Sequence, residues 1–273
     1  MPEKPEVITV VKALKPNLIG RKITDVEVFW DNIIEYPDVE SFKKKLVGQK
    51  INDITTRGKW LVFHLSKDIL LIHLRMEGKF FFRRPTDIKN KHEHVFFTLD
   101  NGEQLRFHDV RKFGKMYLLP KDTYLNEKPL KDMGYEYDDS LLTASYLYNK
   151  LKSKSIPIKT SLLDQSIITG IGNIYDDEIL FLSKISPHRK SNLVTMKECA
   201  SIIKNTRTVL NHAIELGGTT IKSFTSSEGV HGLFQNELLV HGKKNGKCPT
   251  CGTTLKVDKI NGRSSYYCPK CQI

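Results

Sequence analysis

"CPTCGTTLKVDKINGRSSYYCPKC", residues 248–271, is the stretch that decides how the C-terminal end of this chain folds. It holds two Cys-x-x-Cys pairs, Cys248 with Cys251 and Cys268 with Cys271, separated by sixteen residues. This spacing is typical of four thiolates that surround one zinc ion on a β-hairpin, and a unit this small needs the metal to fold. We therefore predict one structural Zn²⁺. A closed four-cysteine site leaves no open position for catalysis.

Arg263 stands between the two pairs, in "INGR", at the predicted tip of the hairpin. An arginine at a tip can hold a phosphate, but its position alone is equally consistent with a solvated charge. A second stretch, "LLDQSIITGIGNIYDDEIL" (162–180), breaks between two helical patterns at "TGIGN" (169–173). Glycines there let the backbone approach an anion at a helix N-terminus, although a plain turn between helices is the commoner explanation.

The charge balance favours a polyanionic partner. Among 273 residues, 43 Lys and Arg stand against 31 Asp and Glu, a formal net charge of +12. Such an excess indicates nucleic acid, without separating DNA from RNA or an anionic membrane surface. No apolar run approaches the roughly 20 residues that span a bilayer, and acidic residues stand where a signal peptide would be basic, so we expect a cytoplasmic protein.

Hydrophobic periodicity divides the chain into parts with helical spacing and a part with β-rich runs. Residues 5–15 have helical spacing, and short β-rich runs from about 22 to 119 predict an antiparallel sandwich or barrel. Helical patterns follow Pro120, including a longer run over 195–216 that contains the fifth cysteine, Cys199, which we expect in the core. That run places on one predicted apolar face Met196, Ala200, Ile203, Leu210 and Ala213. Residues 217–236, rich in Gly, Ser and Thr, predict a loop.

Two motifs at predicted strand ends, "HLRMEGKF" (73–80) and "HDVRKFG" (108–114), mix basic with large apolar side chains. A protein that distorts duplex DNA needs this mixture, because cations hold phosphates while an apolar wedge replaces an extruded base. The alternative is a core Met and Phe with solvated neighbours. Lys59, in "RGKW", opens a predicted strand, where a solvated lysine is the default interpretation.

The chain begins "MPEKPEV". If Met1 is removed, Pro2 presents a secondary amine, and an α-amino group with a reference pKa of about 8 is substantially neutral near physiological pH and can attack directly. The alternative is that proline is merely tolerated at the start, while Glu3 and Glu6 favour a helix N-terminus through the helix dipole.

Taken together and in this order, these stretches resemble the bacterial formamidopyrimidine-DNA glycosylases along nearly the whole chain. The match comprises "MPEKPEV", "RGKW", "HLRMEG", "HDVRKFG", "LLDQSIITGIGNIY", "GGTTIKSF" and the two cysteine pairs. Lys4 and Ile8 depart from the usual family start, where Leu and Glu are common, and neither is a catalytic position. The resemblance implies an α+β fold with an N-terminal β-sandwich (1–134), a helix-two-turn-helix domain (135–236) and a zinc finger (237–273) around a DNA-binding cleft.

The resemblance also implies roles for individual residues. Mature Pro2 would attack C1′ of a damaged nucleotide and expel the base through a Schiff base, with β- and δ-elimination following. Glu3 would do acid–base work on the sugar oxygen, Glu6 would help to hold the N-terminus, and Glu77 could add a contact. Three residues would fill the gap left by the base: Met76, Arg111 and Phe113. Four residues would hold phosphates: Lys59, His73, Asn173 and Arg263. Lys59 is also counted among the catalytic residues. The loop at 217–236 resembles a lesion-recognition loop.

The implied function is a bifunctional DNA glycosylase and AP lyase for oxidised purines, acting in base excision repair on damaged double-stranded DNA, as a monomer at the nucleoid and away from membranes. The related endonuclease VIII branch, which prefers oxidised pyrimidines, is an alternative. A non-catalytic damaged-DNA-binding protein is another. A zinc-ribbon RNA binder is the weakest alternative, because it leaves the N-terminal motif unexplained.

Overall fold

The computed structural model describes residues 1–219 and 232–273, which divide into two compact units. The N-terminal unit comprises Met1–Lys131 with the described ends of the segment Gly217–Gly232. The C-terminal unit comprises Asp132–Leu216 and Leu233–Ile273. The division into 1–134, 135–236 and 237–273 stays a prediction. Of the loop predicted over 217–236, residues 220–231 lie outside the described residues.

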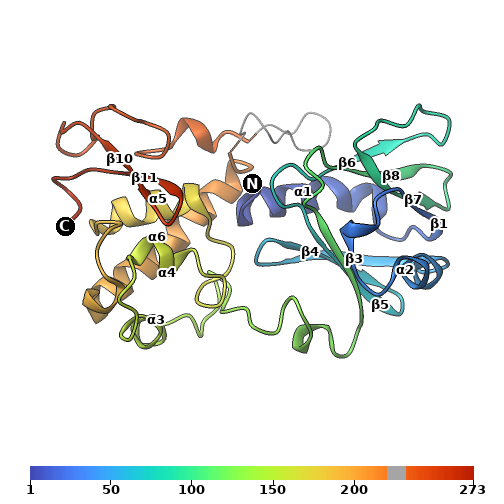
Figure 1. Ribbon diagram of the computed structural model, residues 1–273, viewed down its shortest axis with the longest axis horizontal. Helices are drawn as coiled ribbons and strands as arrows, with labels where there is room; N and C mark the ends of the chain where they lie inside the picture. The colour runs from blue at the N-terminus through green and yellow to red at the C-terminus, as the bar shows by residue number, and fades with distance from the viewer. Residues whose placement is uncertain (220–231) are drawn as a thin grey trace. The chain divides into compact units, whose positions relative to one another are not determined.

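Two sheets form the described part of the N-terminal unit, and Figure 1 shows them as separate layers. One sheet has the order β1 (Ile23–Val28), β7 (Glu93–Leu99), β8 (Gln104–His108), β6 (Lys79–Arg83). The other has the order β2 (Ile34–Tyr36), β9 (Lys115–Pro120), β5 (Asp68–His73), β4 (Trp60–Leu65), β3 (Ile51–Arg57). Neighbouring strands are antiparallel except β2 and β9, which pair in parallel. The predicted β-sandwich is confirmed.

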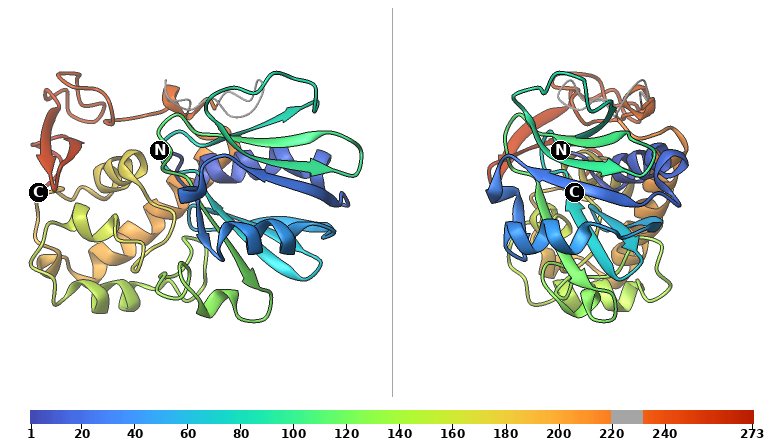
Figure 2. Two further views of the ribbon diagram at one scale, coloured as in Figure 1. Left: turned by 45° about the vertical axis from the view of Figure 1, so that its right-hand side comes forward. Right: turned by 90° about the vertical axis from the view of Figure 1, so that its right-hand side faces the viewer.

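The core of this unit draws apolar side chains from both sheets, among them Phe63 of β4 and Phe107 of β8. Helix α1 (Lys4–Leu18) adds one face of its surface to that core. The spacing over residues 5–15 predicted this face, which consists of Val7, Val10, Val11 and Leu14, and Leu18 extends it beyond the predicted range. A second helix, α2 (Val39–Leu46), contacts β1 and buries Phe42 and Leu46. Single turns of 3₁₀-helix occur at η1 (Asp31–Ile33) and η2 (Tyr124–Asn126). Both views of Figure 2 show the two layers of strands.

Helices dominate the C-terminal unit: α3 (Ala144–Leu151), α4 (Ile158–Leu162), α5 (Asn173–Ser183) and α6 (Met196–Glu215), with single 3₁₀ turns η3 (Ser191–Leu193) and η4 (Phe234–Asn236). The long helix α6 packs against α3 and α5. A two-stranded hairpin, β10 (Lys256–Ile260) with β11 (Arg263–Tyr267), lies against α5, as Figure 1 shows. Within the described residues, no helix combines the length and the apolar character that a membrane span requires.

The buried face of α6 includes the predicted Ile203, Leu210 and Ala213, but the prediction is wrong for its first two residues. Met196 is 44% exposed, and Ala200 is exposed as well. The buried stripe starts at Cys199 and runs through Ile202, Ile203, Thr206, Val209, Leu210 and Ala213. A capping box between Thr195 and Glu198 starts the helix. The first turn therefore forms the cap and does not pack into the core. The prediction for Cys199 is confirmed: it is fully buried, and burial raises the pKa of its thiol to about 11.

Candidate active site

The N-terminus is fixed by a reciprocal helix cap. Glu3 is the N-cap of α1 and forms a capping box with Glu6, whose Oε2 accepts the Glu3 backbone N–H at 2.8 Å. Pro2 is buried immediately before this cap, and Pro5 occupies the first turn of the helix, where a missing N–H costs nothing. The helix-start interpretation of the two glutamates therefore describes the structure correctly. It does not exclude chemistry, because the same cap fixes the position of the chain start.

The second oxygen of Glu6 holds a distant segment. Its Oε1 accepts hydrogen bonds from the backbone N–H of Thr219 at 2.7 Å and from the Thr219 hydroxyl at 3.1 Å. Gly218, with φ of +79°, lies so close that a Cβ there would stand 2.6 Å from the same oxygen. Sequence reasoning assigned Glu6 the task of holding the N-terminus but missed Thr219 and Gly218. The only signal for them was the glycine pair in "GGTT".

The charges of four predicted residues act on the first amino group of the chain. The charges that act on the Met1 amine belong to Glu3, Glu6, Lys59 and Glu77. Burial is the main cause that lowers the pKa of this amine below its usual 8.0, Lys59 lowers it further, and the carboxylates oppose the shift. Lys59 is itself only 6% exposed, just before β4. The lowered pKa belongs to the Met1 amine, and it increases the fraction of that amine that is neutral near pH 7.

A pocket of the N-terminal unit begins at this terminus and extends along the two motif loops. It is lined by Met1, Trp30, Asn32, Arg75, Met76, Arg111, Lys112, Phe113 and Lys115. The three residues predicted to fill a gap in DNA therefore share one pocket with the chain start. Phe113 is 47% exposed, so it is no core residue, and the Arg111 guanidinium lies 4.8 Å from the centre of its ring.

Trp30 is a member of this pocket that sequence reasoning missed. The Lys112 ammonium lies 3.8 Å from the centre of a Trp30 ring, a cation–π contact that ties the first strand region to the "HDVRKFG" loop. In the sequence, Trp30 follows the strand pattern "VEVF" and carries no motif of its own. Only the folded chain brings it beside residues 111–113.

His73 occupies the end of β5, where it is 8% exposed. Its Nδ1 accepts the backbone N–H of Arg75 at 2.9 Å, and its ring packs edge-on against Trp60, 4.8 Å between ring centres. Burial, followed by the charges of Arg75 and Lys59, lowers the pKa of His73 to about 3. The ring is therefore neutral, and because Nδ1 accepts, the proton sits on Nε2, which makes His73 an uncharged donor.

Asn173 and Arg263, ninety residues apart in the chain, come together in the C-terminal unit. Asn173 is the first residue of α5, and its Nδ2 donates to the carbonyl oxygen of Ser264 at 3.0 Å. The preceding hairpin turn, Asn261-Gly262, has positive φ at both residues, 48° and 76°, as a two-residue turn of type I′ requires. This turn presents an exposed Arg263 beside the N-terminus of α5.

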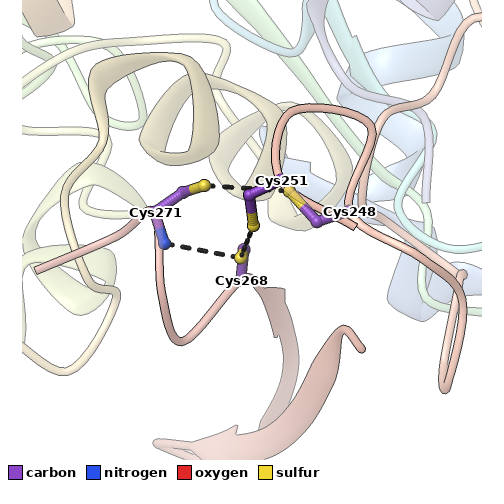
Figure 3. Close-up of side chains that lie close together, drawn as sticks. All are labelled: Cys248, Cys251, Cys268 and Cys271. Carbon is purple, nitrogen blue, oxygen red and sulfur yellow. Dashed lines mark hydrogen bonds between the residues drawn. The ribbon is translucent and has the colours of Figure 1, made fainter. Parts of the chain in front are cut away.

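The four predicted metal ligands form one cluster, drawn in Figure 3. Their sulfur atoms all lie within 4.8 Å of one another, with 3.8 Å between Cys248 and Cys271 and 3.6 Å between Cys251 and Cys268. Tetrahedral zinc with Zn–S bonds of about 2.3 Å separates its sulfurs by about 3.8 Å, so the geometry fits zinc. The predicted structural zinc site is confirmed.

Three stretches of the chain match known sequence families. Residues 1–116 match the formamidopyrimidine-DNA glycosylase N-terminal domain, and residues 133–225 match the formamidopyrimidine-DNA glycosylase H2TH domain. Residues 246–273 match a zinc finger found in FPG and IleRS.

Individual relatives cover the whole chain. The formamidopyrimidine-DNA glycosylase of Oceanobacillus iheyensis is 41% identical over 273 residues, which is 100% of this chain and 98% of the relative. That of Bacillus subtilis is also 41% identical and is covered to 99%.

Solved structures of the Lactococcus lactis protein agree. One of its mutants, in complex with Fapy-dG containing DNA, and its complex with abasic-site DNA each have a TM-score of 0.92 at 35% identity, covering 99% of both chains. A third complex, with an oxidised pyrimidine containing DNA, has a TM-score of 0.90 at the same identity and coverage. The chain therefore belongs to the formamidopyrimidine-DNA glycosylase family.

Proposed function

We propose that this protein is a bifunctional DNA glycosylase and AP lyase that removes oxidised purines, 8-oxoguanine and formamidopyrimidines, from duplex DNA in base excision repair. One observation carries the proposal: the buried chain start, with Glu3 and Lys59 beside it, opens into the pocket that Arg111 and Phe113 line. The names of the relatives and the Fapy-dG complex of the L. lactis protein support the substrate class. The protein acts as a monomer in the cytoplasm, on nucleoid DNA.

The chemistry follows from a secondary amine at the chain start. With Met1 removed, the neutral Pro2 nitrogen attacks C1′ of the damaged nucleotide and the C1′–N9 bond breaks. The Pro2 nitrogen loses its N–H proton in this step, and the base leaves with one proton. Glu3 gives a proton to the ring oxygen O4′ as the sugar opens, which leaves a cationic iminium between Pro2 and C1′. The iminium accepts electrons when C2′ loses a proton and the C3′–O bond breaks. A second elimination then breaks the C5′–O bond.

The remaining predicted residues hold the DNA while the base is outside the stack, which costs a few kcal/mol. Lys59 and His73 contact phosphates from the N-terminal unit, Lys59 as a cation and His73 as a neutral donor. Asn173 and Arg263 do so from the C-terminal unit, where the bond from Asn173 to Ser264 supports the hairpin that carries Arg263. Met76, Arg111 and Phe113 fill the gap, with Arg111 facing the unpaired partner base.

Cleavage of matched duplexes tests the substrate class. We expect duplexes with one 8-oxoguanine opposite cytosine to be cut much faster than duplexes with thymine glycol. A clear preference for thymine glycol would instead place the protein with the pyrimidine-specific branch, a candidate that the L. lactis complex with an oxidised pyrimidine keeps in view.

The second candidate, a DNA-binding protein without catalysis, makes a different prediction about the chain start. A retained Met1 would cap the Pro2 nitrogen and exclude the Schiff base. Mass spectrometry of the intact mature protein decides between the two, and we expect the mass without Met1.

A further inference from the structure

Asp109 is a buried acid that the proposed reaction does not use. It is fully buried, directly after β8, at the start of the loop that carries Arg111 and Phe113. Its Oδ1 accepts the backbone N–H of Arg111 at 3.1 Å, and its Oδ2 accepts those of Phe113 at 2.8 Å and Gly114 at 2.7 Å. One carboxylate therefore binds three backbone amides of the loop, and two of these belong to the residues that would enter the DNA.

The backbone of Asp109 is fixed to the neighbouring strand region. Its N–H donates to the His92 carbonyl at 2.9 Å, and its carbonyl accepts a hydrogen bond from His94 Nε2 at 2.9 Å. Lys112 then adopts a left-handed conformation, with φ of +57°, which is unfavourable for a residue with a Cβ and persists only where the surroundings impose it. The carboxylate bonds on either side of Lys112 supply that constraint.

The Asp109 loop and the loop that carries Met76 both pack against the ring of Phe107. A Cβ at Gly114 would lie 2.6 Å from Cζ of Phe107, and a Cβ at Gly78 would lie 2.9 Å from the same atom. Phe107 is itself fully buried in the sheet. Both loops therefore close onto one ring, and glycine is required at both points of closest approach. A shift of the Asp109 loop would change how Arg111 and Phe113 stand relative to Met76.

We propose that Asp109 is a positioning residue for base extrusion: through its three backbone hydrogen bonds, its carboxylate holds Arg111 and Phe113 in the arrangement that fills the gap beside Met76. The proposal rests on the proposed function, because it concerns how those side chains meet DNA. Asp109 itself touches neither DNA nor the reacting atoms. Its effect passes entirely through the residues that it holds, and a misplacement of about 1 Å is enough to cost up to about 100-fold in rate.

Two substitutions of graded severity test the proposal. Asp109→Ala removes all three acceptor contacts. Asp109→Asn keeps the size of the side chain, but its NH₂ group replaces an accepting oxygen and must face at least one backbone N–H, whichever way the amide turns. We expect single-turnover excision of 8-oxoguanine to fall by about 10- to 100-fold in the alanine variant and by less in the asparagine variant.

A matched control separates positioning from general destabilisation. Glu93→Gln alters another buried carboxylate of the same sheet, which pairs with Arg106 at 3.1 Å and does not reach the pocket. Its thermal stability is to be compared with that of both Asp109 variants. We expect Glu93→Gln to be destabilised while it excises at the wild-type rate once folded at the assay temperature.

The decisive readouts are opposite-base selectivity and a double-mutant comparison. If Asp109 acts through the loop, Asp109→Asn lowers the ratio of excision rates opposite cytosine and opposite adenine. In a background of Arg111→Ala with Phe113→Ala, it then changes the rate less than about twofold, because residues that act as one unit are not additive. Multiplicative losses, or an unchanged ratio equal to that of Glu93→Gln, would overturn the proposal. A wild-type protein inactive on 8-oxoguanine would overturn the proposed function as well, so the two failures are distinguishable.

Discussion

Burial gives His73 a different chemistry from that of Lys59, although both are proposed to hold phosphates. His73 has a pKa of about 3 and an Nδ1 that already accepts the N–H of Arg75, so only its neutral Nε2–H is left to donate. Lysine side chains, in contrast, bind phosphate as cations and release condensed counterions from DNA. The two residues should therefore weaken binding in different ways when they are replaced.

The salt dependence of binding distinguishes these two modes. For a duplex with a stable abasic-site analogue, we expect Lys59→Gln to reduce the slope of log K against log[salt] by about 0.9. We expect His73→Gln to lower affinity by no more than about tenfold and to leave the slope unchanged, because one neutral hydrogen bond is lost. Fluorescence anisotropy over a salt series from about 50 to about 300 mM measures both slopes. Equal slope changes would mean that His73 binds as a cation.

The same residue predicts how stability depends on pH. The pKa of His73 is lowered in the folded state, so between about 3 and 6.5 the unfolded chain binds more protons than the folded one, and stability falls as pH falls through that window. Between pH 8 and pH 5 this one group costs about 2 kcal/mol. Urea unfolding at both pH values should show a loss smaller by about that amount in His73→Gln. An identical loss in both proteins would show that His73 titrates normally; other histidines contribute equally to both and cancel.

Among the secondary-structure elements, sequence patterns predicted correctly those that form from residues close together in the chain. The helical spacing over 5–15 and the cysteine spacing over 248–271 both describe structures that form from neighbouring residues, and both are confirmed. Helix α2 was missed because only Phe42 and Leu46 are buried in it, too short a stripe to stand out. On α6 the prediction was wrong only for Met196 and Ala200, because the helix starts at the cap of Thr195 and its first buried residue is Cys199.

Helix α5 shows what such patterns cannot reach. Its N-terminal residue Asn173 bonds to the hairpin, while the Glu178 carboxylate accepts the N–H groups of residues 239–241, which lead into the zinc finger. Burial raises the pKa of Glu178, and these three backbone bonds oppose the shift. The residues that form these hydrogen bonds are more than sixty positions apart in the sequence, so hydrophobic periodicity cannot predict them. They make α5 the element that supports the zinc finger from two sides.

Loss of zinc should therefore act on DNA binding through the hairpin. Without the metal, the unit that carries Arg263 loses its folding energy, and we expect Cys268→Ser to weaken binding to the abasic-analogue duplex at least as much as Arg263→Ala does. Thermal unfolding of the N-terminal unit is the control, since its core contains none of the four cysteines. An unchanged dissociation constant would mean that the finger takes no part in holding DNA.

For the molecule as a whole, sequence motifs predicted the residues of the candidate site, but they did not predict the residues that hold those site residues in place. Pro2, Glu3 and Lys59 stand in motifs that the resemblance interprets, and the charges of Glu3 and Lys59 act on the first amine of the chain. Thr219, in contrast, acts through a contact with Glu6 across 213 residues, and Asp109 acts through backbone amides that no side-chain pattern reveals. Motifs identify side chains that meet a substrate. The residues that hold those side chains emerge only from tertiary packing.

In the proposed reaction, the Pro2 nitrogen attacks C1′ of the damaged nucleotide. Borohydride reduction during reaction with a duplex that holds one 8-oxoguanine, followed by mass spectrometry of the adduct, tests it most directly. We expect a covalent complex mapped to Pro2, and none with Pro2→Gly beyond a residual level, although this variant should still bind the duplex. An adduct mapped to a lysine, or trapping on abasic-site DNA without trapping on 8-oxoguanine, would contradict the nucleophile or the substrate respectively. If neither duplex traps, the Schiff base itself is wrong.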